Sequence, residues 1–107
     1  MSGSATVADE TFWDLAAPRI AAGAVVEGTM MGTRCLRRDG EFVAMIARTW
    51  EGLVVKLPPE RVDELVEAGT GLCFAPNGKV FRAWLHVPDV DEAIWSGLLD
   101  EAIAAAG

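Results

Sequence analysis

The chain is poor in the residues that build metal and redox sites. It has one histidine and two cysteines, Cys35 and Cys73, which lie far apart in the sequence and form no CxxC pair. A zinc site needs three or four ligands of these types at close spacing, so we expect no metal. The pattern predicts that both cysteines are reduced and buried, acting as small hydrophobic residues. A disulfide or a reactive thiol is the alternative.

Long apolar segments are also absent. The longest apolar runs, such as residues 21–26, fall far short of the roughly 20 residues that span a bilayer. The first four residues show neither the basic region nor the apolar segment of a secretory signal. We therefore expect a cytoplasmic protein with no membrane partner.

The sequence contains no recognisable catalytic motif. It has no GxSxG elbow, and its single histidine, His86, has no nearby serine or cysteine in a triad pattern. The glycines are spaced neither as a P-loop nor as a dinucleotide-binding fingerprint. Adjacent acids such as Asp63 and Glu64 are expected on solvated helix surfaces. We expect no enzyme, no catalytic residue and no cofactor. The alternative is an enzyme that acts on a small ligand held between the sheet and the helices, and no motif supports it.

What the chain does have is enough apolar surface for one core. Of its 107 residues, 51% are hydrophobic. A chain of this length folds as one domain with a single two-layer core. We expect one domain over residues 1–107, with residues 1–5 disordered.

Three segments show helical periodicity and capping residues. A helix over 7–17 is predicted to begin after the cap Thr6 and to end before Pro18, which lacks the N–H donor that a helix needs. A second helix begins at Pro59 and ends near Gly69. A third is predicted to begin at Asp89, with apolar residues on one side from Ile94 to Ile103.

Short apolar runs separated by turn dipeptides fill the region between the first and last helices. Asp39-Gly40 and Asn77-Gly78 are typical of two-residue hairpin turns, and Glu51-Gly52 marks a further reversal. The predicted strands are 28–37, 42–48, 53–57, 72–75 and 80–87. The fold class is therefore α+β: two layers, a five-stranded mainly antiparallel sheet with three helices on one face, in the order αβββαββα.

Three motifs occur in the order found in a known family. They are Met30-Met31-Gly32, the segment 39–46 (DGEFVAMI) and the segment 53–60 (LVVKLPPE). Over roughly residues 8–106 the chain resembles the TfoX N-terminal domain family, which is related to the YjbR-like proteins. That family usually has Met-Phe-Gly-Gly at its first strand. This chain departs from the pattern, because Met31 and Thr33 replace the Phe and the second Gly.

The resemblance implies a small bacterial α/β domain, similar in outline to secretion-chaperone-like folds. The namesake of the family regulates bacterial competence, whereas most stand-alone members have no assigned activity. The resemblance supplies no catalytic residue that could be transferred to this chain.

Charge is distributed unevenly along the sequence. Residues 24–57 and 70–88, which include the predicted strands, hold seven basic and four acidic residues, a net charge of +3. The rest of the chain holds two basic and twelve acidic residues, a net charge of -10. We therefore expect acidic helices and a mildly basic sheet.

Strand alternation divides the sheet into two faces. The all-apolar set Leu53, Val55 and Leu57 is expected to pack against the helices, as are Phe81, Ala83, Leu85 and Val87. In the second strand we assign Phe42, Ala44 and Ile46 to one face. The opposite face, hereafter the far face, is the candidate interaction surface, with Val43, Met45, Val54, Lys56, Arg82, Trp84 and His86.

An exposed mixture of tryptophan, methionine and arginine is typical of a protein interface. Two alternatives remain: a loop or the N-terminal arm covers this face, or Trp84 belongs to the core because the strand is out of phase. His86 is expected to be a hydrogen-bonded structural residue, with a rim or pH-sensitive contact as the alternative. Trp13 and Trp95 are expected in the core, and Trp50 is either packed or a surface anchor.

The favoured hypothesis is a non-catalytic binding or regulatory module whose far face forms a homodimer or contacts a partner protein. The second hypothesis is a nucleic-acid accessory protein that stacks bases on Trp84. Its phosphate-contacting residues would be Arg34, Arg37, Arg38, Lys56 and Arg82. The sequence pI of about 4.5 argues against this second hypothesis, since phosphate binding needs a basic surface.

Overall fold

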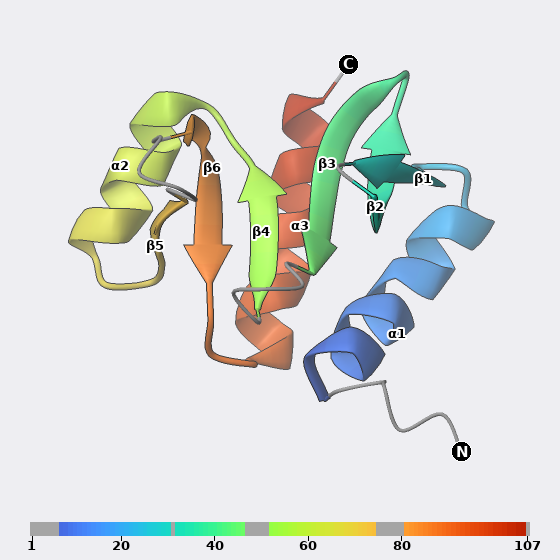
Figure 1. Ribbon diagram of the computed structural model, residues 1–107, viewed down its shortest axis with the longest axis horizontal. Helices are drawn as coiled ribbons and strands as arrows, with labels where there is room; N and C mark the ends of the chain where they lie inside the picture. Colours follow the sequence, from blue (N-terminus) through green and yellow to red (C-terminus); the bar gives the residue numbers. More distant parts are fainter. Residues whose placement is uncertain (1–6, 31, 47–51, 75–80, 107) are drawn as a thin grey trace.

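The computed structural model describes residues 7–30, 32–46, 52–74 and 81–106, and these form three helices and one six-stranded antiparallel sheet (Figure 1). The helices are α1 (Val7–Ala21), α2 (Pro59–Glu67) and α3 (Glu92–Ala105). The strands are β1 (Val26–Met30), β2 (Thr33–Arg38), β3 (Glu41–Ile46), β4 (Leu53–Lys56), β5 (Leu72–Phe74) and β6 (Phe81–Val87). The strand order is β1-β2-β3-β4-β6-β5. The predicted α+β class is confirmed.

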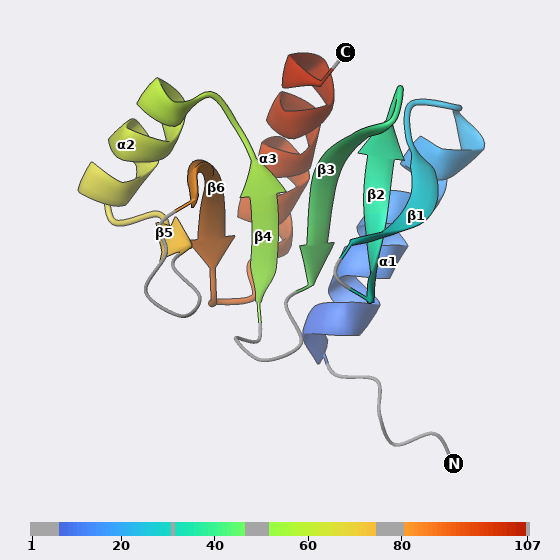
Figure 2. The same cartoon turned by 45° about the horizontal axis from the view of Figure 1, so that its top comes forward.

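All three helices contribute to one core on a single face of the sheet. In Figure 2, α1 and α3 lie behind the sheet, and α2 lies beside β6. Phe12 of α1 and Trp95 of α3 are fully buried in this core, as the sequence predicted for Trp95. Trp13 is only partly buried and packs at its margin. No helix of the described residues is long and apolar enough to cross a membrane.

The sheet has one strand more than predicted. The segment 28–37, expected as one strand, is a hairpin in which β1 and β2 pair with Met30 opposite Thr33. Gly32 reverses the chain there with a φ of 77°, a conformation that glycine adopts without steric cost. The prediction treated this segment as continuous, although Gly32 was the available signal for the reversal.

The helix boundaries differ from the predictions at two places. α1 continues through Pro18 to Ala21, and the Pro18 carbonyl still accepts a hydrogen bond from the Ala22 N–H at 3.0 Å. Proline lacks its own donor but not its acceptor, and tertiary packing of the last turn offsets its cost. α3 begins at Glu92 rather than at Asp89, because the Asp91 carboxylate caps it by accepting from the Ile94 N–H at 3.0 Å.

Other turn and cap predictions are confirmed within the described residues. Asp39 and Gly40 both have positive φ, 52° and 82°, as the predicted hairpin turn requires. α2 begins at Pro59, and Gly69 follows it with a φ of 81°. Predictions that involve residues 1–6, Met31, Trp50, the arm preceding α1 and the Asn77-Gly78 turn lie outside the described residues.

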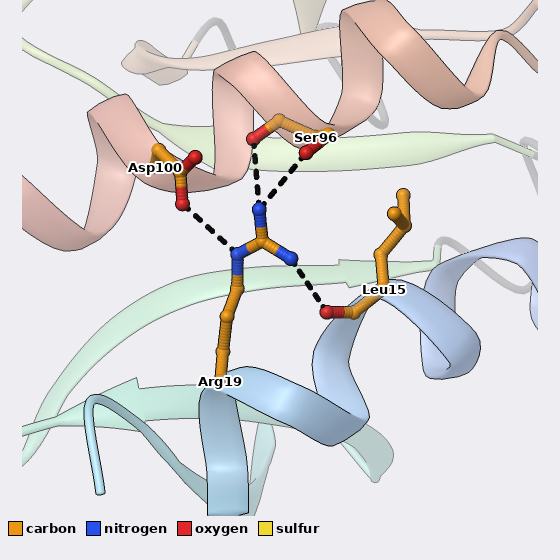
Figure 3. A network of polar contacts seen from close by, with 4 residues as sticks. All are labelled: Leu15, Arg19, Ser96 and Asp100. Carbon is orange, nitrogen blue, oxygen red and sulfur yellow. Dashed lines mark hydrogen bonds and ion pairs between the residues drawn. The ribbon is translucent and has the colours of Figure 1, made fainter. Parts of the chain in front are cut away.

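Two arginines bind the other helices to α3. The Arg19 guanidinium donates to the Leu15 carbonyl at 2.7 Å, to the Ser96 Oγ at 2.9 Å and to the Asp100 Oδ1 at 3.0 Å (Figure 3). On α2, Arg61 donates to both carboxylate oxygens of Glu101, at 2.8 and 3.0 Å. These are the two basic residues that the sequence places outside the sheet region, and both are used to fix the helical layer.

Candidate functional site on the far face of the sheet

A bulge in β3 decides which side chains reach the far face. Leu36 of β2 pairs with Ala44, but the next residue, Arg37, pairs with Phe42, so Val43 is an extra residue in β3. As a result Phe42 lies on the far face with Met45, and Val43 packs in the helix-covered core. The predicted placement of these two residues was wrong, because simple alternation fails across a bulge.

A second irregularity adds another aromatic ring to this face. Between β5 and β6, Cys73 pairs with Leu85, whereas the next residue, Phe74, pairs with Phe81. Phe81 therefore lies beside Trp84, with ring centroids 5.0 Å apart, instead of following Leu85 toward the helices. The predicted position of Phe81 on the helix-packed face was wrong for the same reason as that of Phe42.

The far face carries its own hydrophobic cluster, separate from the main core. Trp84 lies at its centre: its ring stacks on Phe42 at 4.6 Å and on Phe74 at 5.5 Å. We call the following eight strand residues the far-face cluster: Met30, Cys35, Phe42, Met45, Val54, Phe74, Phe81 and Trp84. Such offset aromatic stacks are favourable beyond the area that they bury.

The predicted surface residues divide into a buried layer and an outer layer. Met45, Val54 and His86 are buried, with 4%, 0% and 6% of their surfaces exposed. Trp84, Lys56 and Arg82 form the outer layer: Trp84 is half-buried, and the Lys56 and Arg82 side chains are 42% and 75% exposed. The expectation that the whole set forms an exposed patch was therefore wrong. The aromatic rings cover its inner members.

His86 is a packed residue of the far face. It pairs with Val54 of β4 and Leu72 of β5, and its ring lies edge-on to Phe74 at 6.3 Å. Its Nε2 lies 3.2 Å from the position that a Cβ on Gly52 would take. Gly52 has a φ of 130°, so this close approach requires glycine.

Basic residues of the sheet do not gather on one face. Arg34 lies on the helix-covered side, 2.6 Å from Glu27 and 4.0 Å above the Trp13 ring. The Arg82 guanidinium lies 3.9 Å from Asp63 of α2, so this exposed base is paired with an acid of the helical layer.

The remaining described bases of the sheet also have partners. Arg38 donates to the Ala24 carbonyl at 2.8 Å, and Lys56 lies 3.6 Å from Glu41. The Arg37 guanidinium donates to the carbonyls of Thr29 and Gly40. The bases of the described sheet are thus engaged individually and do not form a continuous positive surface.

Hydrogen bonding and burial change the proton affinities of two carboxylates and one thiol among the described residues. Hydrogen bonding from Arg34 lowers the pKa of Glu27, and hydrogen bonding from Arg61 lowers the pKa of Glu101. Burial raises the pKa of Cys35, which keeps this thiol protonated and unreactive. Cys73 is free and exposed, so the prediction of two buried thiols holds only for Cys35.

Exposed apolar residues border the far-face cluster at both edges of the sheet. Val26 of β1 pairs with Arg37, and Leu72 of β5 pairs with His86, so both belong to the far-face register. They are 59% and 54% exposed. Sequence analysis missed both, because Val26 precedes the strand predicted at 28–37 and Leu72 was assigned to no face. A turn predicted at Gly32 would have revealed a strand on each side of it, and Val26 would then have been placed opposite Arg37.

Among the described residues, no group of three or more histidine, cysteine or acidic side chains could hold a metal ion. Comparisons with known proteins find no match for the chain, whether with family models, curated proteins or solved structures.

Proposed function

We propose that this chain is a non-catalytic binding or regulatory module that acts in the cytoplasm through protein–protein contacts on the far face. The observation that carries the proposal is the position of the far-face cluster. Its eight residues all lie on strands, and they form a cluster separate from the core that the described helices share. The half-buried rings of Phe81 and Trp84 form its outer surface.

The composition of this surface fits a protein partner. Val26 and Leu72 extend the apolar surface to both edge strands, and Lys56 and Glu41 supply charge at its border. An apolar centre with a polar rim, rich in aromatic residues, is the usual anatomy of a protein interface. Tryptophan is also the residue most often found to dominate binding energy when it is truncated.

Membership of the TfoX N-terminal domain family is part of the proposal. The motifs at 30–32, 39–46 and 53–60 support it, and a regulatory role without catalysis agrees with the absence of catalytic motifs in the sequence.

Nucleic-acid binding is less well supported than protein binding. A phosphate-binding surface needs several bases on one face. Here Arg34 and Arg82 face helix residues, and Arg37 and Arg38 donate to backbone carbonyls. Twelve acids on the helical side would repel a phosphate backbone further.

The proposal is tested with two matched double variants. Val26→Lys/Leu72→Lys changes exposed apolar residues of the far face, and Val7→Lys/Ile94→Lys changes exposed apolar residues of the helical layer. We expect the first pair to reduce binding to the protein's partner, measured by sedimentation and by quantitative capture, at least tenfold. The second pair should leave it unchanged. If both double variants bind as the unmodified protein does, the far face is not the interaction surface.

A further inference from the structure

We infer that the partner of the far face is a second copy of this chain, joined face to face about a two-fold axis. This inference rests on the proposed function and names its occupant. Three observations carry it: the distribution of charge over the two faces, the mixed signs of charge around the far-face cluster, and the positions of the exposed apolar residues.

Charge makes the helical layer unsuitable for self-association. The helices and the segment preceding α3 carry the following acids: Asp9, Glu10, Asp14, Glu60, Asp63, Glu64, Glu67, Asp89, Asp91, Glu92, Asp100 and Glu101. The only bases in these segments, Arg19 and Arg61, are already bound to acids of α3 or α2. Two copies that approached through their helices would bring like charges together.

The far face lacks this barrier. Among the described residues, the charged side chains that border its cluster include Arg37, Glu41 and Lys56, so both signs of charge are present. An interface about a two-fold axis uses the same patch twice, so that patch must be complementary to itself. A surface with an apolar centre and charges of both signs meets this condition. It also turns the twelve helical acids of each copy outward, away from the other copy.

The sheet topology provides an arrangement for this contact. β3 and β4 occupy the middle of the strand order, and β1 and β5 form its two edges. A two-fold axis that runs along the strands between β3 and β4 places β1 of one copy over β5 of the second. The exposed Val26 and Leu72 then both enter the interface, with the stacked rings of Phe42 and Trp84 nearer its centre. Face-to-face packing of two sheets is a common architecture.

Sedimentation over a dilution series at low and high salt tests the inference. We expect twice the chain mass, with dissociation at low concentration. Salt should tighten the dimer, because it screens the repulsion between two chains that each carry a net charge of -7. Contact between the far face of one copy and the acidic helices of another would weaken with salt and grow beyond a dimer. Either of those results would overturn the face-to-face arrangement.

The double variants described above then locate the interface. We expect Val26→Lys/Leu72→Lys to raise the dimer dissociation constant at least tenfold and Val7→Lys/Ile94→Lys to leave it unchanged. Both variants reduce the net negative charge equally, so net repulsion cannot account for a difference between them. Circular dichroism and the thermal midpoint verify that each variant is folded. Equal weakening in both variants would overturn the assignment to the far face.

A monomer at every concentration would overturn self-association. If that monomer captures another protein, and only Val26→Lys/Leu72→Lys abolishes the capture, the proposed function stands and the inference of a second copy fails. If neither self-association nor face-dependent capture is found, both fail.

Discussion

The two faces of the sheet achieve burial in different ways. Among the described residues, twenty buried side chains from the strands, all three helices and adjoining segments form one core on the helix-covered face. The far-face cluster has five buried residues in the same part of the chain, all of them on strands. Val54 and Val55 are consecutive in β4 and have no exposed surface, yet they belong to different clusters. On one face helices cover the strands, and on the other broad aromatic rings cover smaller side chains. Complete burial of a residue therefore does not reveal what covers it.

The largest loss of stability is expected at Gly52, which directly precedes β4 and lies against the end of β6. In Gly52→Ala, the new Cβ would lie 2.7 Å from the Val87 carbonyl oxygen and 2.7 Å from the Pro88 Cα. The φ of 130° also disfavours any other residue. We expect the free energy of unfolding to fall by about 3 kcal/mol, the sum of backbone strain and overpacking, measured by urea denaturation.

Gly69→Ala is the control for Gly52→Ala. Its φ of 81° is also positive, but a Cβ there meets no atom within 4 Å. It should cost only about 1 kcal/mol, the backbone contribution alone. If the two variants lose equal stability, the close contact at Gly52 contributes nothing.

The next effect compares the two faces directly through Val55→Ala and Val54→Ala. Both remove the same atoms from fully buried positions, so the transfer contribution is equal. The cavity contribution differs, because side chains on the open far face can relax more readily than those held under helices. We expect losses of about 2–3 kcal/mol for Val55→Ala and about 1–2 kcal/mol for Val54→Ala in urea denaturation. Equal losses would show that the far-face cluster is packed as rigidly as the main core.

The sequence predicted the helices, strands and turns better than it predicted which side chains of a strand point to which face. Turn residues and caps identified the Asp39-Gly40 hairpin and α2, and alternation correctly placed Val55 toward the helices and Val54 away from them. It failed at Val43 and Phe81, where the register shifts. A bulge changes the face of every residue beyond it, and its position depends on pairing with a strand distant in the sequence.

Prediction of the candidate site was limited in the same way, because it too depends on contacts between strands that are distant in the sequence. Sequence analysis identified Met45, Val54, Trp84 and His86 as members of one face, and the strand register brings them together. It did not predict that Phe42 and Phe74 would cover part of that set. Coverage by another strand is a tertiary property, and no local pattern encodes it.

A smaller effect is expected from the helical layer's polar contacts. In Arg19→Met, the aliphatic part of the side chain is preserved while its hydrogen bonds to Leu15, Ser96 and Asp100 are lost. Asp100 is 66% exposed and can be hydrated again. We expect a loss of about 1–2 kcal/mol in urea denaturation, with no change in association through the far face. A change in association would mean that the two faces are coupled.

The smallest expected effect is a pH dependence of the helical layer. Hydrogen bonding from Arg61 lowers the pKa of Glu101 below its ordinary value of 4.5. The carboxylate form is therefore favoured in the folded state, and this stabilisation is complete above that ordinary value and disappears as the pH falls through the lowered one. Because the pair is partly exposed and screened by solvent, Arg61→Gln should lower the free energy of unfolding only slightly at pH 7. The difference in the free energy of unfolding between Arg61→Gln and the unmodified protein should shrink as the pH falls below 4.5.

Arg38→Gln is the control, because Arg38 donates to the Ala24 carbonyl, which does not titrate. Urea denaturation from pH 7 to pH 3 should give a constant difference for Arg38→Gln, and a constant difference for Arg61→Gln as well would contradict the role of Glu101.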